Sequence, residues 1–151
     1  GQEEKQMTYT YHSILPEIEE ICNKNTDCYV KYLHGRPFSC PYRDLCFEDY
    51  EGPNNGITAL ETAILARFME LKTGKPHGKF YFTFGSDSRF PFPNGYIIIL
   101  AENEQEAIKK FREKYPDRNE GTVNCAFWYT EEQWLETENK TSYTEPAEVF
   151  A

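Results

Sequence analysis

The stretch FYFTFGSDSRFPFPNGYIIILA, residues 80–101, decides the fold of this chain. Aromatic side chains dominate its first part, Phe80–Phe84, and a β-branched run fills its last part, Tyr96–Ala101. Both compositions are typical of β-strands, and the second is apolar enough to predict a central strand of a sheet. The segment between them, Gly85–Gly95, contains two prolines and therefore predicts a long loop.

A third strand and two more helices are predicted after this pair. A helix capped by Asn103 is expected to end before Pro116, and Val123–Tyr129 is predicted as the third strand. The helix between the second and third strands predicts a right-handed βαβ crossover, with the two strands parallel if they share a sheet. The remaining elements expected here are a short helix capped by Thr130 and Gln133 and an edge strand within residues 145–150.

The first half of the chain is predicted to be helical. Ser13 can cap a first helix that ends near Asn25. Thr58 and Glu61 form the pattern of a capping box, which predicts a longer helix that stops at Gly74.

Four cysteines in this half are the sequence feature with the most specific chemistry. They form two pairs, each with five intervening residues, and eleven residues separate the pairs. Four thiolates can close a tetrahedral shell around one ion, so the spacing favours a structural zinc site, with two disulfides or four free thiols as the alternatives. His34 lies between the pairs and can replace one cysteine as a ligand. The predicted zinc ligands are Cys22, Cys28, Cys40 and Cys46.

The predicted fold class is α+β. A zinc-stapled helical N-terminal half is expected to pack on a small three- to four-stranded sheet with one βαβ crossover. Residues 1–52 form the zinc-binding four-cysteine segment with its helix, and residues 53–151 form the α/β portion. A chain of 151 residues has the length of one domain, so we expect the two segments to form a single compact domain.

The composition argues against several classes of protein. The net charge is −9, and such a chain repels phosphate backbones, which disfavours general nucleic-acid binding. The longest apolar run, residues 97–101, is too short to span a bilayer. The first residues contain no apolar signal segment, and five cysteines without one favour a reducing compartment. The fifth, Cys125, is expected to be a small buried hydrophobic residue.

The sequence contains no catalytic signature, and we therefore predict that the protein is not an enzyme. His12, His34 and His77 are scattered, and none belongs to an HExxH pair. A closed four-thiolate zinc leaves no position for a water molecule, which argues against metal catalysis there. The long loop between the first two strands is a second candidate for recognition, although its Asp87 and Arg89 can simply pair with each other.

Five short segments form a set: FTFGSD (82–87), FPF (90–92), PDR (116–118), NCAF (124–127) and YTEE (129–132). This set resembles a family of small uncharacterised proteins from phages and mobile elements of low-GC Gram-positive bacteria, over about a third of the chain. The cysteine segment that ends CPYRDLC also looks like short metal-binding stretches of such phage proteins. The combination is similar in character to anti-CRISPR proteins that inhibit the type II RNA-guided nuclease. That class shares no motif, so the resemblance transfers no functional residues.

The resemblance and the charge together predict a phage-encoded inhibitor that acts by protein–protein binding in the cytoplasm of the bacterial host. Its expected partner is a large basic nucleoprotein, such as a type II CRISPR nuclease with its guide RNA, whose DNA engagement it blocks. The alternative is a zinc-knuckle phage protein that binds nucleic acid through the basic and aromatic residues of 29–43. The acids expected to contact the partner are Glu131, Glu132, Glu136 and Glu138, with Glu102, Glu104 and Glu106 as a second group.

Overall fold

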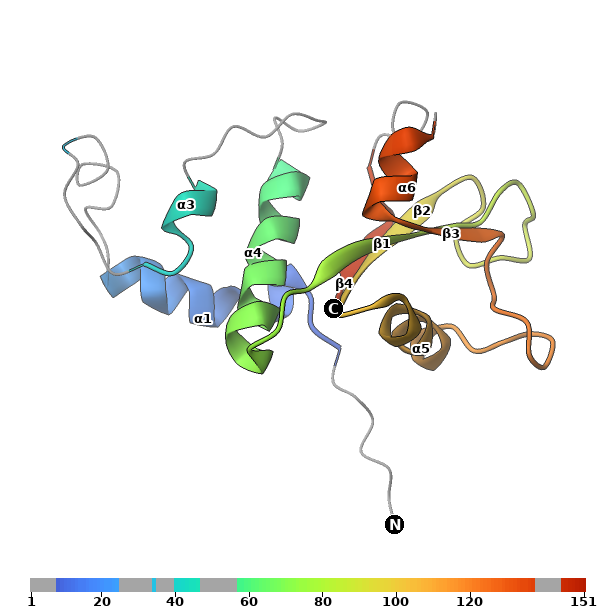
Figure 1. Cartoon of the computed structure of the whole chain (residues 1–151), viewed down its shortest axis with the longest axis horizontal. Helices are drawn as coiled ribbons and strands as arrows, with labels where there is room; N and C mark the ends of the chain where they lie inside the picture. The colour runs from blue at the N-terminus through green and yellow to red at the C-terminus, as the bar shows by residue number, and fades with distance from the viewer. Residues whose placement is uncertain (1–7, 25–33, 35–39, 47–56, 138–144) are drawn as a thin grey trace, which may run out of the picture.

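The structure is a computed structural model of the whole chain, and it describes residues 8–24, 34, 40–46, 57–137 and 145–151. It combines helices with one four-stranded sheet, so the predicted α+β class is confirmed at this level. Helices α1, α3 and α4 gather at one end, and the sheet with α5 and α6 lies at the other (Figure 1). The elements in chain order are α1 (Tyr11–Lys24), α3 (Arg43–Cys46), α4 (Ile57–Thr73), β1 (Gly78–Thr83), β2 (Tyr96–Ala101), α5 (Glu104–Lys114), β3 (Phe127–Thr130), α6 (Glu131–Glu136) and β4 (Glu148–Phe150).

The sheet is built around β1, which lies between β2 and β3 and runs antiparallel to both. The predicted edge strand near the C-terminus is confirmed, because β4 pairs in parallel with the outer side of β2 and completes the order β3-β1-β2-β4. Since β1 opposes both of its neighbours, β2 and β3 run in the same direction without pairing. The connection through α5 therefore joins strands that are separated by β1, and the handedness of a crossover stays a prediction.

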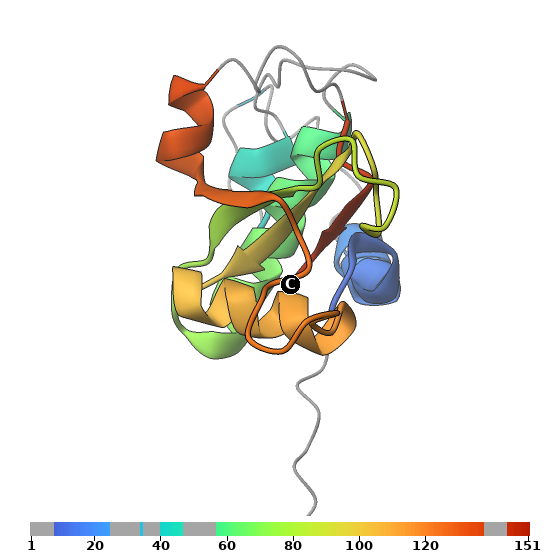
Figure 2. The same ribbon diagram turned by 90° about the vertical axis from the view of Figure 1, so that its right-hand side faces the viewer.

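The two central strands are buried on both faces, because their side chains alternate between two hydrophobic cores. Along β2, Ile97 enters one core and Ile98 enters the other, and the alternation continues to Leu100. The core around Ile97 receives α5, and the core around Ile98 receives α1, α3, α4 and α6. Figure 2 shows α5 and α6 on opposite sides of the sheet.

Stacked aromatic rings join a helix to each face of β1. Trp134 of α6 lies over Tyr81, with ring centroids 4.4 Å apart and planes inclined by 8°. On the other face, Phe111 of α5 lies over Phe82, with centroids 4.8 Å apart and planes inclined by 2°. Aromatic pairs contribute about 0.5–1.5 kcal/mol beyond the area that they bury, so these contacts help to position both helices.

Two predicted helix caps are wrong. Thr10, rather than Ser13, caps α1: the amide of Ser13 donates to Thr10 Oγ1, and the amide of Thr10 donates to Ser13 Oγ. Helix α4 already includes Ile57, so Thr58 lies inside the helix and its carbonyl accepts the hydroxyl of Thr62. In both cases the helix begins before the residue whose side chain resembled a cap.

Three other predicted helix boundaries are confirmed. The side chain of Asn103 accepts the amide of Glu106 at the start of α5. Thr130 and Gln133 form a complete capping box at the start of α6. Gly74, with a φ of 76°, follows the last residue of α4, in the left-handed region where glycine carries no Cβ penalty.

The third strand begins later than predicted. It spans Phe127–Thr130 rather than Val123–Tyr129. Before it, the amide of Cys125 donates to the carbonyl of Val123 and closes a tight turn, which takes these residues out of the extended conformation. The apolar run is thus shared between a turn and a strand.

Helices α1, α3 and α4 share one core with the sheet. Ile14 of α1, Leu45 of α3 and Tyr81 of β1 belong to the same buried cluster. Arg67 of α4 also binds Asp44 of α3 through two hydrogen bonds of 3.0 and 2.8 Å. Within the described residues, no helix has both the length and the apolar character that crossing a membrane requires.

Truncating the ring at the centre of the α5-facing core tests this arrangement. Phe82 has no exposed surface, so we expect Phe82→Ala to lower the free energy of unfolding by about 3–5 kcal/mol. Urea denaturation followed by circular dichroism measures the loss. Leu71→Ala is the matched control, because Leu71 is 56% exposed and should change stability by no more than about 0.5 kcal/mol. Equal effects of the two substitutions would contradict the two-core sheet.

Candidate functional site

The edge strand β3 and the helix after it expose large apolar side chains. Phe127, Trp128 and Leu135 are 65%, 37% and 52% exposed. Clusters of exposed apolar groups bordered by polar residues are typical of protein interaction sites. Here the neighbouring polar residues are carboxylates of α6. Neighbouring residues of a strand point to opposite faces, and Trp128 faces α5, where it binds Glu104. We therefore call Phe127, Glu131, Glu132, Leu135 and Glu136 the β3–α6 surface.

Three of the acids predicted to contact a partner lie on this surface. Glu131, Glu132 and Glu136 are exposed, and among the described residues none of them forms an ion pair. Glu138 lies outside the described residues. Carboxylates without an internal cation remain available to a basic partner.

Helix α6 fixes the positions of these carboxylates. Its capping box begins the helix at Glu131, and Trp134 anchors it in the core with 5% of its surface exposed. Burial raises the pKa of Tyr81, and the charge of Glu131 raises it further, so this carboxylate lies within electrostatic reach of the buried ring. Both a local cap and a tertiary contact therefore position this six-residue helix.

The apolar half of the β3–α6 surface was missed from sequence. Phe127 and Trp128 belong to an apolar run that predicted a strand. The run gives no sign that its strand lies at the sheet edge, where one side has no neighbour among the described strands. The tryptophan has a polar anchor as well: Trp128 Nε1 donates to Glu104 Oε1 at 2.9 Å.

The acids of the second predicted group already have binding partners within the same chain. Glu104 accepts the indole of Trp128, Glu102 lies 3.8 Å from the ammonium of Lys75, and Glu106 lies 3.0 Å from that of Lys110. These carboxylates already have donors or cations of their own. Their role toward a partner stays a prediction, and they do not extend the open acidic surface of α6.

Two of these acids join a histidine in a group that can hold a metal ion. The potential donor atoms of His77, Glu102 and Glu106 lie within 4.8 Å of one another. His77 was predicted to be isolated, because Glu102 and Glu106 lie 25 and 29 positions later in the chain. The available signal was the spacing of Glu102 and Glu106, four residues apart at the start of a helix.

The predicted four-cysteine zinc site is described only in part. Cys22 and Cys46 are exposed, Cys40 is half-buried, and Cys28 lies outside the described residues. Burial is the main effect that raises the pKa of Tyr11. The negative charge of Glu61 raises this pKa further, and so do the charges of Cys22 and Cys46. Two of the predicted ligands, far apart in sequence, therefore lie within electrostatic reach of the same phenol.

The segment of the alternative zinc-knuckle prediction is also described only in part. Of residues 29–43, positions 29–33 and 35–39 lie outside the described residues. His34, the alternative ligand, is exposed.

The loop between β1 and β2, predicted as a second candidate for recognition, contains its own ion pair. Arg89 Nε and a terminal guanidinium nitrogen donate to both carboxylate oxygens of Asp87 at 2.8–3.2 Å. Hydrogen bonds from Arg89 lower the pKa of Asp87 to about 2. The predicted pairing is confirmed, and the two opposite charges balance each other in the lining of a small cavity of about 150 Å³.

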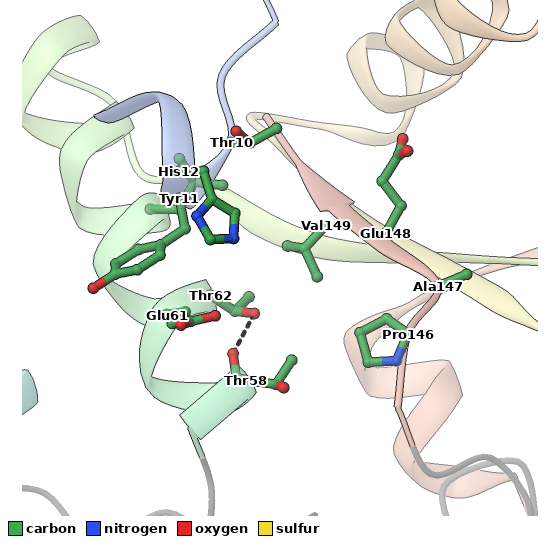
Figure 3. Close-up of a pocket in the computed structure, with 11 residues that line it drawn as sticks. Thr10, Tyr11, His12, Thr58, Glu61, Thr62, Pro146, Ala147, Glu148 and Val149 are labelled. Carbon is green, nitrogen blue, oxygen red and sulfur yellow. Dashed lines mark hydrogen bonds between the residues drawn. The ribbon is translucent and has the colours of Figure 1, made fainter. Parts of the chain in front are cut away.

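A larger groove of about 400 Å³ runs along the outer side of β4. Figure 3 shows that the start of α1, the start of α4 and residues 146–149 form its walls. Two of its polar groups have partners within the protein: the hydroxyl of Thr62 donates to the carbonyl of Thr58, and Glu148 accepts the hydroxyl of Tyr115. Thr62 and Glu148 are therefore already engaged within the chain.

Comparisons with protein-family models, with curated proteins and with solved structures give no match to this chain. The function is therefore argued from the residues and from the geometry.

The predicted burial of Cys125 is confirmed and can be tested by thiol reactivity. The residue is 8% exposed, and burial raises the pKa of its thiol to about 12. At pH 8 the thiol stays protonated, so we expect it to react with a disulfide reagent only after unfolding. Wild type and Cys125→Ser should show the same number of fast-reacting thiols when folded and differ by one in denaturant. A difference of one in the folded state would contradict the burial.

The same thiol is expected to make the free energy of unfolding depend on pH. Because the folded-state pKa lies above the ordinary value of 9.0, the contribution of Cys125 to stability is complete below about pH 9 and is lost as the pH rises toward 12. Cys125→Ala should flatten this part of the stability profile in urea denaturation between pH 8 and the alkaline limit of folding.

Proposed function

We propose that this chain is a binding protein without catalytic activity, and that it docks on a basic protein surface through the β3–α6 surface. The observation that carries the proposal is the combination of two features on adjacent elements. Three exposed carboxylates form no ion pair among the described residues, and they accompany apolar side chains of which Phe127 is 65% exposed.

These features correspond to different parts of a protein interface. Aromatic anchors near the centre of an interface provide most of the binding energy, and charges at the rim provide orientation and association rate. Phe127 and Leu135 can serve as the anchors. Glu131, Glu132 and Glu136 can serve as the acidic rim, so the second group of predicted acids is not needed for docking.

The partner that we propose is a type II RNA-guided nuclease with its guide RNA, in the cytoplasm of a bacterial host. The resemblance to small phage proteins points to this class. Charge complementarity supports it, because the channel that holds nucleic acid in such nucleases is strongly positive. Residues 80–151 carry thirteen acids and seven bases, and an acidic surface in that channel would block DNA engagement.

We also propose that Cys22, Cys28, Cys40 and Cys46 bind one structural zinc ion. Its role would be to hold the front segment, where α3 has only four residues and cannot be stable on its own. The support is the spacing of the cysteines, together with the position of Cys22 and Cys46 within electrostatic reach of Tyr11.

Removing the apolar anchors tests the docking surface. Phe127→Ala with Leu135→Ala should weaken inhibition of guide-directed DNA cleavage by about tenfold or more, because truncation of an interface anchor costs about 1–2 kcal/mol or more. The measurement is the inhibitor concentration that halves the cleavage rate of purified nuclease. Leu71→Ala removes a similarly exposed side chain from α4 and should leave this concentration unchanged.

Charge reversal separates the contribution of the rim. Glu131→Lys, Glu132→Lys and Glu136→Lys together should slow association and remove its dependence on salt, with no loss of helical circular dichroism. Wild-type protein that inhibits no type II nuclease would refute the assigned partner. Inhibition that survives both sets of substitutions would refute the β3–α6 surface.

Metal analysis tests the zinc site. Purified protein should contain one zinc ion per chain, and the double substitution Cys22→Ser with Cys46→Ser should lose it, because neutral hydroxyls do not replace thiolates. Atomic emission together with thiol counting measures both quantities. Full-length protein that folds without stoichiometric zinc would refute this part of the proposal.

A further inference from the structure

We propose that His77, Glu102 and Glu106 bind one divalent first-row transition cation, at the point where β1 begins, β2 ends and α5 begins. Their donor atoms already lie within 4.8 Å of one another. The group belongs neither to the four cysteines nor to the β3–α6 surface. Its function would be to tie two strands and a helix together.

Strand pairing and one helix cap bring the three side chains together. Gly78 pairs with Ala101 at the end of the ladder, so His77, just before β1, and Glu102, just after β2, are the next residues beyond this pair. The side chain of Asn103 then accepts the amide of Glu106 at 2.8 Å and begins α5. The end of the ladder and the first turn of the helix therefore meet at one place.

The imidazole of His77 is buried and oriented as in many metal-binding histidines. Its side chain is 1% exposed, and Nδ1 lies 2.9 Å from the carbonyl oxygen of Lys75. A carbonyl can only accept, so Nδ1 carries the hydrogen and Nε2 is the nitrogen that can bind an ion. Nε2 faces Glu106 Oε1 at 3.9 Å, which is too long for a hydrogen bond.

One imidazole nitrogen and two carboxylates suit Mn²⁺, Fe²⁺ or Zn²⁺ better than Ca²⁺ or Mg²⁺, whose sites are usually built from oxygen alone. Metal–ligand bonds of about 2.0–2.2 Å require donors that are roughly 3 Å apart, so the two carboxylates must rotate slightly inward. The side chains of Glu106 and Glu102 are 19% and 25% exposed, so water can reach the ion and complete its coordination.

Two lysines already neutralise the two carboxylates, and a metal ion must compete with them. The ammonium of Lys75 lies 3.8 Å from Glu102 and is 68% exposed, so it can move into solvent at little cost. Lys110 is different, because it is 6% exposed and lies 3.0 Å from Glu106 Oε1 and 3.4 Å from the carbonyl of Leu100. Its charge stays beside the ion and weakens binding.

The experiment is a titration of the full chain with Mn²⁺, followed by ¹H–¹⁵N NMR. Mn²⁺ is paramagnetic and broadens the signals of nearby nuclei, and its preference for nitrogen and oxygen ligands keeps it from the thiolates. We expect selective broadening of the amides of residues 76–79 and 102–107 and a rise in the melting temperature. Lys110→Met should bind Mn²⁺ about tenfold more tightly than wild type, because it keeps the apolar stem and removes the competing charge.

Variants of the ligands decide whether the ion is held by this group. His77→Ala and Glu106→Gln should each weaken binding by at least about tenfold. Glu106→Gln keeps the shape of the side chain, so it remains informative if His77→Ala fails to fold. Glu113→Gln is the matched control, because Glu113 is an exposed acid of the same helix and should leave binding unchanged.

Two results would overturn the proposal. One is the absence of selective broadening up to about 1 mM Mn²⁺ in folded protein, which would leave the group as an ion-pair cluster. The other is binding that persists unchanged in both ligand variants, which would place the ion on other carboxylates. Neither result bears on the inhibition assay, which depends on different residues.

Discussion

Burial of β1 and β2 on both faces is the constraint on which the rest of the structure depends. A strand whose side chains alternate between two cores needs a cover on each side, or half of its apolar surface stays in water. Phe82 packs against α5, and its neighbour Tyr81 packs against α6 and the core of the front helices. Helix α5 therefore covers one face of the strand pair, and α6 covers the other together with α1, α3 and α4.

The same constraint leaves the two edge strands, β3 and β4, as the parts of the sheet that a partner can reach. The outer strands have only four and three residues, and short edge strands limit pairing with other chains. On β3 the exposed aromatic side chains occur with carboxylates that follow directly on α6. Such a site favours a partner that is both apolar and positively charged, and it disfavours a second copy of the same acidic surface.

The end of the β1–β2 ladder, where His77, Glu102 and Glu106 lie, is polar rather than apolar. There, charged groups gather in a partly buried space, and their charges are balanced by lysines of the same chain. His77 Nε2 faces a carboxylate there, and this donor set is the physical reason to propose a metal ion. The cysteine site would stabilise the front segment, and the His77 site would stabilise the junction of sheet and α5, so the two sites serve different parts of the fold.

Much of this fold was predicted from sequence where local interactions determine structure. The caps at Asn103 and Thr130, the stop at Gly74 and the two apolar strands each depend on residues within a few positions of one another. The caps at Ser13 and Thr58 were wrong, because several side chains near a helix start can cap it and packing selects among them.

The candidate sites depended far more on tertiary structure. Local sequence determined that Glu131, Glu132 and Glu136 would follow a cap on one short helix. Only the tertiary structure decided that Phe127 lies on an edge strand, and that His77 meets Glu102 and Glu106 from the other side of a strand pair. The physical reason is that capping and side-chain periodicity act within one or two turns of chain, whereas strand order and ladder register are decided by contacts between distant segments, which leave no trace in the neighbouring sequence.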